Sequence, residues 1–166
     1  MNQRQAITSV GTEDLEQLDG LLNVFLGETQ ARCALIVDRS GRLLTAAGDT
    51  AALDRITFAS LVAGDFAASA QLATILGERE FSSLYHHGGD RSMYLADIAG
   101  WAILAALFDG RTTLGMIRLK TRSVVPKLAG RFEAIATRAA APGISEFSGA
   151  WAEEAESQID RLFAEG

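Results

Sequence analysis

Residues 33–47 read CALIVDRSGRLLTAA, and this stretch decides the first part of the fold. Cys33–Val37 is a short apolar run suited to a buried strand, and Arg42–Ala47 returns as a second strand. The tetrapeptide Asp-Arg-Ser-Gly at 38–41 favours a turn, because Asp opens such turns and Gly accepts a positive φ. The stretch therefore predicts a β-hairpin.

Two predicted helices flank this hairpin in the sequence. Before it, Thr12 is placed to cap a helix with apolar residues at helical spacing, which ends near Gly27–Gln30. After it, Asp54 is placed to cap a longer helix that runs to about Leu76, with Gly77 just past its end.

The second helix has two apolar faces of different character. One is bulky and consists of Phe58, Leu61, Val62, Leu72 and Leu76. The other consists mostly of small residues: Ser60, Ala63, Gly64, Ala67, Gln71 and Thr74. Gly64 costs about 1 kcal/mol against Ala inside a helix. The small face therefore either lets another backbone approach closely or packs tightly within its own domain, and the pattern alone favours neither.

Three strand-like stretches follow, each ended by a turn signal: 80–87, 91–98 and 101–108. The connections are short enough for antiparallel neighbours. The stretch 101–108 is apolar on both faces, which places it in the centre of the sheet. The stretch 80–87 is the most polar, which places it toward an edge that is open to pairing with another chain.

A third helix begins at Thr112 or Thr113, and Pro126 within it should kink or split it. Beyond the break at 142–143, apolar residues including Trp151 and Phe163 share one face of a predicted tail helix. We expect a flexible leader at 1–11, one domain at 12–140 and a tail helix at 141–166. The fold class is an α/β sandwich with one antiparallel five-stranded sheet, in the order α-β-β-α-β-β-β-α plus the tail helix.

Composition limits the function. The 166 residues carry a net charge of −6, which would repel a nucleic-acid backbone. No apolar run approaches the roughly 20 residues that a membrane-spanning helix needs, and the N-terminus carries no apolar signal region. A single cysteine, Cys33, allows no intramolecular disulfide, and a small buried hydrophobe is its simplest interpretation. We therefore expect a cytoplasmic protein without membrane insertion or nucleic-acid binding.

The residues also predict no catalytic centre, no metal site and no cofactor. The phosphate-loop, GxGxxG, GxSxG and HExxH patterns are absent from the sequence. The only histidines, His86 and His87, are neighbours in a predicted strand and so point to opposite faces. Several arginines lie at element ends, where one of them could be presented to a nucleotide held by a partner, although solvated charge is the simpler interpretation. They are Arg39, Arg42, Arg55, Arg91 and Arg111.

Three stretches together resemble the roadblock/dynein light-chain family. They are the hairpin at 34–44, the helix segment FASLVAGDFAASAQLATILGE and the segment LFDGRTTLGMIRLKTRS, in the family's order. Within that family the likeness is to bacterial proteins of the MglB type. It covers about residues 12–138, and no single motif in it is chemically distinctive.

The resemblance implies a homodimer in which the second helices pack together and the third strands pair. The implied interface residues are Ser60, Ala63, Gly64, Ala67, Gln71, Phe81, Ser83 and Tyr85. It also implies a small Ras-like GTPase of the MglA type as partner. The dimer would stimulate GTP hydrolysis by repositioning the GTPase's own catalytic residues, without supplying an arginine. The implied GTPase contacts are Ala68, Thr74, Trp151 and Phe163.

Two other functions remain open. A roadblock scaffold would link proteins in a polarity, motility or transport complex without altering hydrolysis, and would bind the GDP and GTP forms equally. A small-ligand sensor would need a pocket with convergent polar groups, which the nearly all-aliphatic and aromatic predicted core argues against.

Overall fold

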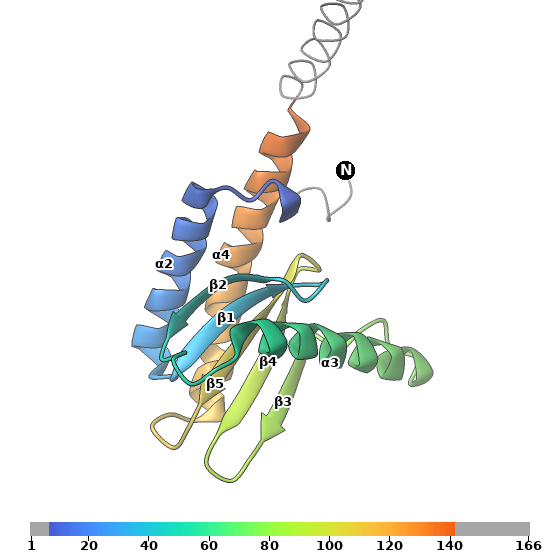
Figure 1. Ribbon diagram of the computed structural model, residues 1–166. Helices are drawn as coiled ribbons and strands as arrows, with labels where there is room; N and C mark the ends of the chain where they lie inside the picture. Colours follow the sequence, from blue (N-terminus) through green and yellow to red (C-terminus); the bar gives the residue numbers. More distant parts are fainter. Residues whose placement is uncertain (1–6, 142–166) are drawn as a thin grey trace, which may run out of the picture.

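The hairpin forms as the sequence predicts, in a computed structural model that describes residues 7–141 (Figure 1). Strand β1 (Cys33–Asp38) pairs antiparallel with β2 (Leu43–Gly48). Asp38 holds the turn, because its buried carboxylate accepts hydrogen bonds of 2.9 Å from the backbone N–H groups of Ser40 and Arg42. Gly41 has a φ of +90°, as expected of a glycine at this turn.

The order of elements within the described residues is the predicted α-β-β-α-β-β-β-α. The remaining elements are α2 (Thr12–Thr29), α3 (Arg55–Ile75), β3 (Ser83–His87), β4 (Ser92–Ile98), β5 (Ala102–Phe108) and α4 (Leu114–Ala140). The predicted tail helix, with Trp151 and Phe163, lies outside the described residues, as do residues 1–6 of the predicted leader.

The five strands form one antiparallel sheet in the order β2-β1-β5-β4-β3. β5 lies in the centre, as its apolar character predicts, and β3 lies at an edge. β3 is shorter than the predicted stretch 80–87, because pairing with β4 begins only at Ser83 and the charged residues before it are exposed.

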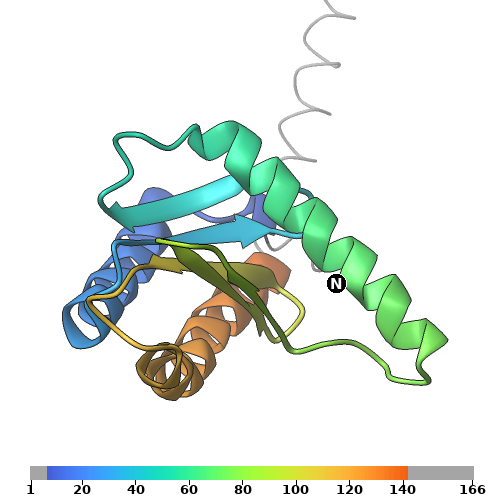
Figure 2. The same ribbon diagram turned by 90° about the horizontal axis from the view of Figure 1, so that it is seen from below.

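Helices cover the two faces of the sheet unequally (Figure 2). α2 and α4 lie side by side on one face and enclose the larger core, which includes Leu22, Leu104 and Phe132. α3 lies alone on the other face over a smaller core centred on Leu35, Val62 and Phe66. It runs across the sheet and extends past its edge, so much of this helix has nothing packed over it.

Local interactions explain where the helices begin. Gly11, and not Thr12, is the N-cap of α2, and the Asp14 side chain accepts a 2.8 Å hydrogen bond from the Gly11 N–H. Asp54 caps α3 as predicted, accepting from the Thr57 N–H at 3.2 Å. Thr113, one of the two candidates, caps α4.

Two details narrow the expectations from the sequence. Pro126 does not split the third helix, because α4 continues from Leu114 to Ala140 with Val124 and Leu128 buried on either side of the proline. Tertiary packing on both sides offsets the lost backbone hydrogen bond. The leader is also not loose throughout: Ile7 is buried, and its carbonyl accepts a 2.9 Å hydrogen bond from Arg42.

The Asp14 carboxylate predicts how stability depends on pH. Burial opposes its charge, but hydrogen bonds from Gly11 and from Arg138, at 2.6 Å, outweigh burial and hold the pKa of Asp14 below its ordinary value of 3.8. A carboxylate with a lowered folded-state pKa stabilises the fold above its unfolded pKa and loses that contribution as the pH falls. Replacing Asp14 by Asn should therefore flatten the loss of stability as the pH falls below about 4.

Urea denaturation across this pH range measures the effect. Glu16→Gln is the matched control, because it removes an exposed carboxylate from the same helix. Equal acid sensitivity of the wild-type protein and Asp14→Asn would contradict the assignment.

Candidate interaction surface

The outward face of α3 carries most of the exposed large hydrophobic side chains among the described residues. Five of the nine large hydrophobic side chains that are exposed lie on this helix or its cap: Ile56, Leu61, Leu72, Ile75 and Leu76. Such side chains are normally scattered singly on a soluble protein. Their concentration on one helix makes this helix a candidate interaction surface.

Gly64 lies at the centre of this outward face. A Cβ built on Gly64 meets nothing within 4 Å, so the chain's own packing does not require a glycine there. Gly64 is exposed, like Ser60, Ala67 and Gln71, its neighbours on the predicted small face. A glycine in mid-helix costs about 1 kcal/mol against Ala, and no contact within the described residues offsets that cost.

Ala63 is placed differently from the rest of the predicted small face. It is 8% exposed, and its Cβ lies 3.6 Å from the position that a Cβ on Gly41 would occupy. The Ser60 Cα lies 3.0 Å from the same position, so both residues pack against the β1–β2 turn of their own domain, and Ala63 differs in being buried. The small face serves two purposes, and only its outer part is free for a partner.

The predicted bulky face is also partly buried and partly exposed. Val62 is buried and Phe58 is partly buried against the smaller core, whereas Leu61 and Leu72 are 67% and 56% exposed. Sequence reasoning did not assign Leu61, Leu72 or Ile75 to the interaction surface. The available signal was the apolar character of nearly the whole helix circumference, which exceeds what one core can cover.

β3 supplies the second predicted interface element. It pairs with β4 alone, so its other edge has no strand partner within residues 7–141. Tyr85 is 42% exposed and stacks on Phe108 with ring centroids 6.2 Å apart. Ser83 is partly buried in the strand, and Phe81 is partly buried in the bend before it.

The two histidines serve different faces of β3, as predicted. His86 Nε2 lies 2.7 Å from Asp65 Oδ2 on α3. His87 Nδ1 lies 3.0 Å from the Ser92 hydroxyl and 3.1 Å from the Tyr85 hydroxyl, on the other face. The two histidines therefore do not converge on one metal site. Residues 7–141 contain no cluster of three His, Cys, Asp or Glu side chains suited to a metal ion.

The candidate arginines are mostly held by their own domain. Arg39 pairs with Asp97 and lies over the Phe66 ring at 4.9 Å. Arg111 pairs with Asp109 at 3.0 Å. These ion pairs hold Arg39 and Arg111 on their own domain, whereas Arg55 and Arg91 form no ion pair within residues 7–141.

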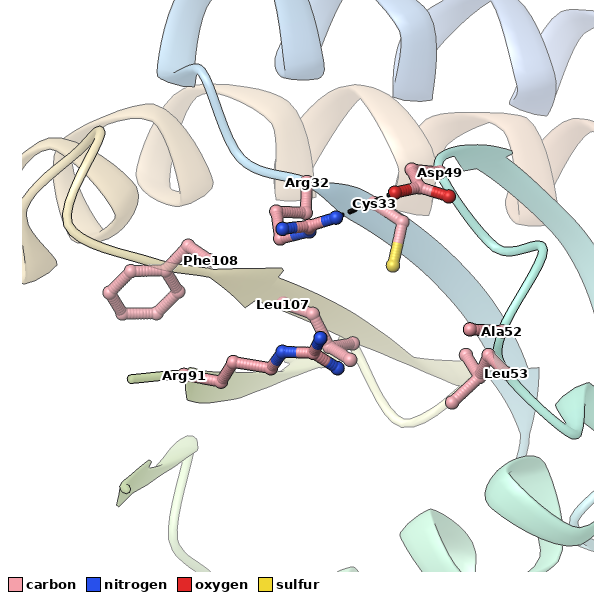
Figure 3. A pocket seen from close by; sticks show the side chains of 8 residues that line it. All are labelled: Arg32, Cys33, Asp49, Ala52, Leu53, Arg91, Leu107 and Phe108. Atoms are coloured by element: carbon pink, nitrogen blue, oxygen red, sulfur yellow. Dashed lines mark hydrogen bonds and ion pairs between the residues drawn. The ribbon is translucent and has the colours of Figure 1, made fainter. Parts of the chain in front are cut away.

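A small pocket beside β1 contains the cysteine (Figure 3). Its volume is about 70 Å³, which is far below that of a nucleotide or drug-sized ligand site. Arg32 spans its rim and pairs with Asp49 at 2.7 Å and Asp109 at 3.4 Å. Burial, followed by the Asp49 charge, raises the pKa of the Cys33 thiol above its ordinary 9.0. Burial and the raised pKa together predict low reactivity of the Cys33 thiol.

The predicted GTPase contacts are only partly described. Ala68 and Thr74 are exposed on α3, flanking the outward face. Trp151 and Phe163 lie outside the described residues.

The α3 segment also has the length and composition of a membrane-spanning helix, with 28% of that segment buried in the chain. It is the one such helix among residues 7–141. A soluble helix that is covered on two faces by protein has the same composition.

The chain has a five-stranded antiparallel sheet with two helices on one face and one long apolar helix on the other. This is the arrangement of a roadblock-type domain. The Roadblock/LC7 domain profile matches residues 17–108. The chain belongs to this family, as the resemblance in its sequence predicted.

Solved structures of MglB proteins are similar to the chain in both sequence and fold. MglB of Myxococcus xanthus is 31% identical with a TM-score of 0.72, and the match covers 75% of this chain and 94% of that one. The gliding protein MglB of Thermus thermophilus is 33% identical with a TM-score of 0.69, covering 75% and 93%. A Roadblock/LC7 domain from Streptomyces avermitilis, at 12% identity, a TM-score of 0.61 and coverage of 66% and 92%, shares the fold. A search of curated protein sequences found no match.

The buried thiol predicts slow chemical modification. Because the thiolate is the nucleophile and Cys33 is 2% exposed with a raised pKa, the native protein should react with a thiol reagent at least about 100-fold more slowly than the urea-unfolded protein at neutral pH. Absorbance after mixing with a chromogenic disulfide reagent measures both rates. Equally fast labelling of the native protein would show that Cys33 is accessible.

Proposed function

We propose that the protein is a homodimeric regulator of a small Ras-like GTPase and stimulates GTP hydrolysis by repositioning the GTPase's own catalytic residues. The observation that carries the proposal is the likeness, at 31–33% identity over three quarters of the chain, to MglB proteins. Consistent with it, the surface that the domain leaves open is apolar and lies on a helix and a strand edge, as a protein-binding module requires.

The dimer would use both open features at once. Pairing of two β3 edges would continue the sheet across the two chains and satisfy the outward backbone groups of that strand. The two-fold symmetry of such a dimer would also bring the two α3 helices together, with Gly64 at the point of closest approach. Leu84 and Met93, which α3 covers only partly, would then lie beneath the partner's helix. One of the similar solved structures, 32% identical to the chain, is of MglB with tetrameric arrangement.

Regulation of a GTPase would not require chemistry from this chain. Three of the five candidate arginines, Arg39, Arg42 and Arg111, are engaged in ion pairs, and the Cys33 pocket is too small for a nucleotide. A binding surface that selects the hydrolysis-competent arrangement of a partner can accelerate the partner's own reaction, because only unequal binding of the two states shifts their populations. Ala68 and Thr74 on α3, with Trp151 and Phe163 of the tail, are the proposed GTPase contacts, and the cytoplasm is the proposed site of action.

The proposed dimer is tested by introducing a charged side chain into its α3–α3 interface, called the α3 seam below. Ala67 is exposed on the outward face of α3, so Ala67→Glu should leave the fold intact while placing a carboxylate opposite its symmetry mate. We expect a dimer for the wild-type protein and a fall of about 100-fold or more in dimer affinity for the variant, because a buried unpaired charge costs several kcal/mol. Light scattering with size-exclusion chromatography measures the mass.

Ala134→Glu is the matched control, because it makes the same change at an exposed position on α4. Dimers that persist in Ala67→Glu, or monomers in the control alone, would refute the assigned seam. Ala63 is unsuitable for this test, because a bulky side chain there would disturb its own hairpin.

The GTPase proposal is tested with a small Ras-like GTPase encoded by the same organism. Two copies of the protein per GTPase should speed single-turnover GTP hydrolysis by about tenfold or more, which corresponds to a barrier reduction of about 1.4 kcal/mol. The dimer-breaking Ala67→Glu variant should lose this stimulation. Unchanged hydrolysis, together with equal affinity for the GDP and GTP forms, would instead support a passive scaffold that links proteins in a polarity or motility complex.

A further inference from the structure

A groove lies between β3–β4 and α4, on the face of the sheet opposite α3. It has a volume of about 280 Å³. Its apolar lining comes from Tyr94, Ala96, Val125 and Pro126, and Ser83 of the edge strand lies along it. The groove is therefore a second open surface, separate from the outward face of α3.

Two arginines line this groove without a partner. Arg118 and Arg122, one helical turn apart on α4, are exposed, and neither forms an ion pair with a residue in 7–141. The basic residues on the α2 side of the same helix behave differently, since Lys120 pairs with Glu28 at 3.4 Å and Arg138 with Asp14 at 2.6 Å. Lys127 and Arg131 also form no ion pair within residues 7–141, so the groove holds two of the four unpaired basic residues of α4.

A buried hydroxyl group without a hydrogen-bond partner also lies at this groove. Thr121, between the two arginines in sequence, lines the groove and is 4% exposed. Its Oγ1 has no hydrogen-bond partner within the described residues and is the one buried side-chain oxygen or nitrogen there in that state. A buried polar group without a partner is unfavourable, so a further molecule or segment that completes this region would be stabilised.

We propose that the acidic C-terminal segment of the same chain, residues 142–166, docks in the groove between β3 and α4. Charge is the first argument. α4 carries six Lys or Arg residues and a single Glu, whereas residues 142–166 carry six Asp or Glu residues and a single Arg. The charges of the segment are thus complementary to those of the helix that precedes it.

Chain length is the second argument. The groove residues Arg118–Pro126 lie 15–23 positions before Ala141, which places them roughly 22–35 Å back along α4 at a rise of about 1.5 Å per residue. A segment of 25 residues reaches about 37 Å even if it is wholly helical. Pro142 and Gly143 follow α4 directly, a pair that favours a reversal of chain direction. A segment that returns along α4 brings residues 157–166 beside Arg118 and Arg122.

The sequence at 157–166 fits both parts of the groove. Ile159, Leu162 and Phe163 have the i, i+3, i+4 spacing of one apolar helix face, which suits the lining formed by residues such as Tyr94 and Val125. Asp160 and Glu165 supply the carboxylates for the two arginines. Docking here would keep Phe163 away from any partner protein, so the groove and a partner would compete for the tail.

This interaction does not depend on the proposed GTPase regulation or on the α3 seam, because the groove lies on the other face of the sheet. Its failure would leave both of those proposals intact.

Hydrogen exchange of the full-length protein tests the docking. We expect amides at 157–166 to exchange at least about tenfold more slowly than in a synthetic peptide of residues 142–166. The double variant R118E/R122E should lose this protection, and high salt should weaken it, because the Debye length falls to about 3 Å at 1 M. The double variant K127E/R131E is the matched control, since it makes the same charge change at the same spacing on α4 outside the groove lining. Adding D160R/E165R to R118E/R122E should restore protection.

Peptide-like exchange at 157–166 in the wild-type protein, or equal loss in both double variants, would overturn the proposal. A cysteine pair, R122C with D160C, identifies the chain that supplies the segment, because Cys33 is buried and does not compete. Oxidation should give a crosslinked product of monomer mass on a denaturing gel. A dimer-mass product would show that the segment of a second copy fills the groove, which would also overturn docking within one chain.

Discussion

The burial of β1 on both of its faces is the constraint on which the rest of the structure depends. All six residues of Cys33–Asp38 are buried, between β2 on one side and β5 on the other. Alternate side chains point to opposite faces, so Ala34 and Ile36 enter the core under α2 and α4, whereas Leu35 and Val37 face α3. A strand of this kind needs cover on two faces, and a three-layer arrangement follows.

The two layers of cover are not equivalent. α2 and α4 are tied to each other by ion pairs, Arg138 with Asp14 and Lys120 with Glu28, and together they complete the larger core. α3 has no helix beside it within the described residues and presents Gly64, Leu61 and Leu72 to solvent. The same face of the sheet ends in the unpaired edge of β3. The domain is thus covered more fully on the α2/α4 side, apart from the groove beside Arg118 and Arg122, than on the α3 side.

Much of this could be predicted from the sequence, because local chemistry specifies it. The turn at Asp38–Gly41, the cap at Asp54 and the apolar run of β5 each depend on neighbouring residues, and all formed as expected.

The structure differs from the expectations where tertiary contacts decide the outcome. Packing on both sides of Pro126 keeps α4 continuous. The candidate surface was predicted in outline, but a residue pattern could not separate Ala63, held by its own hairpin, from the exposed Ala67. The groove beside Arg118 and Arg122 was also not foreseen, because it exists only where α4 crosses β3 and β4.

The central claim is that the open α3 side of the domain is a surface for self-association. Hydrogen exchange at the outer edge of β3 tests this claim most directly. Within one chain, Ser83–His87 pairs only with β4, so amides that point away from β4 have no strand partner among residues 7–141. Paired edges in a dimer would protect these amides to the same degree as the amides that bond β4, and dilution below the dimer dissociation constant would release them. Exchange at the rate of an exposed loop, at a concentration where the protein has dimer mass, would contradict the account, because the chains would then associate through another surface.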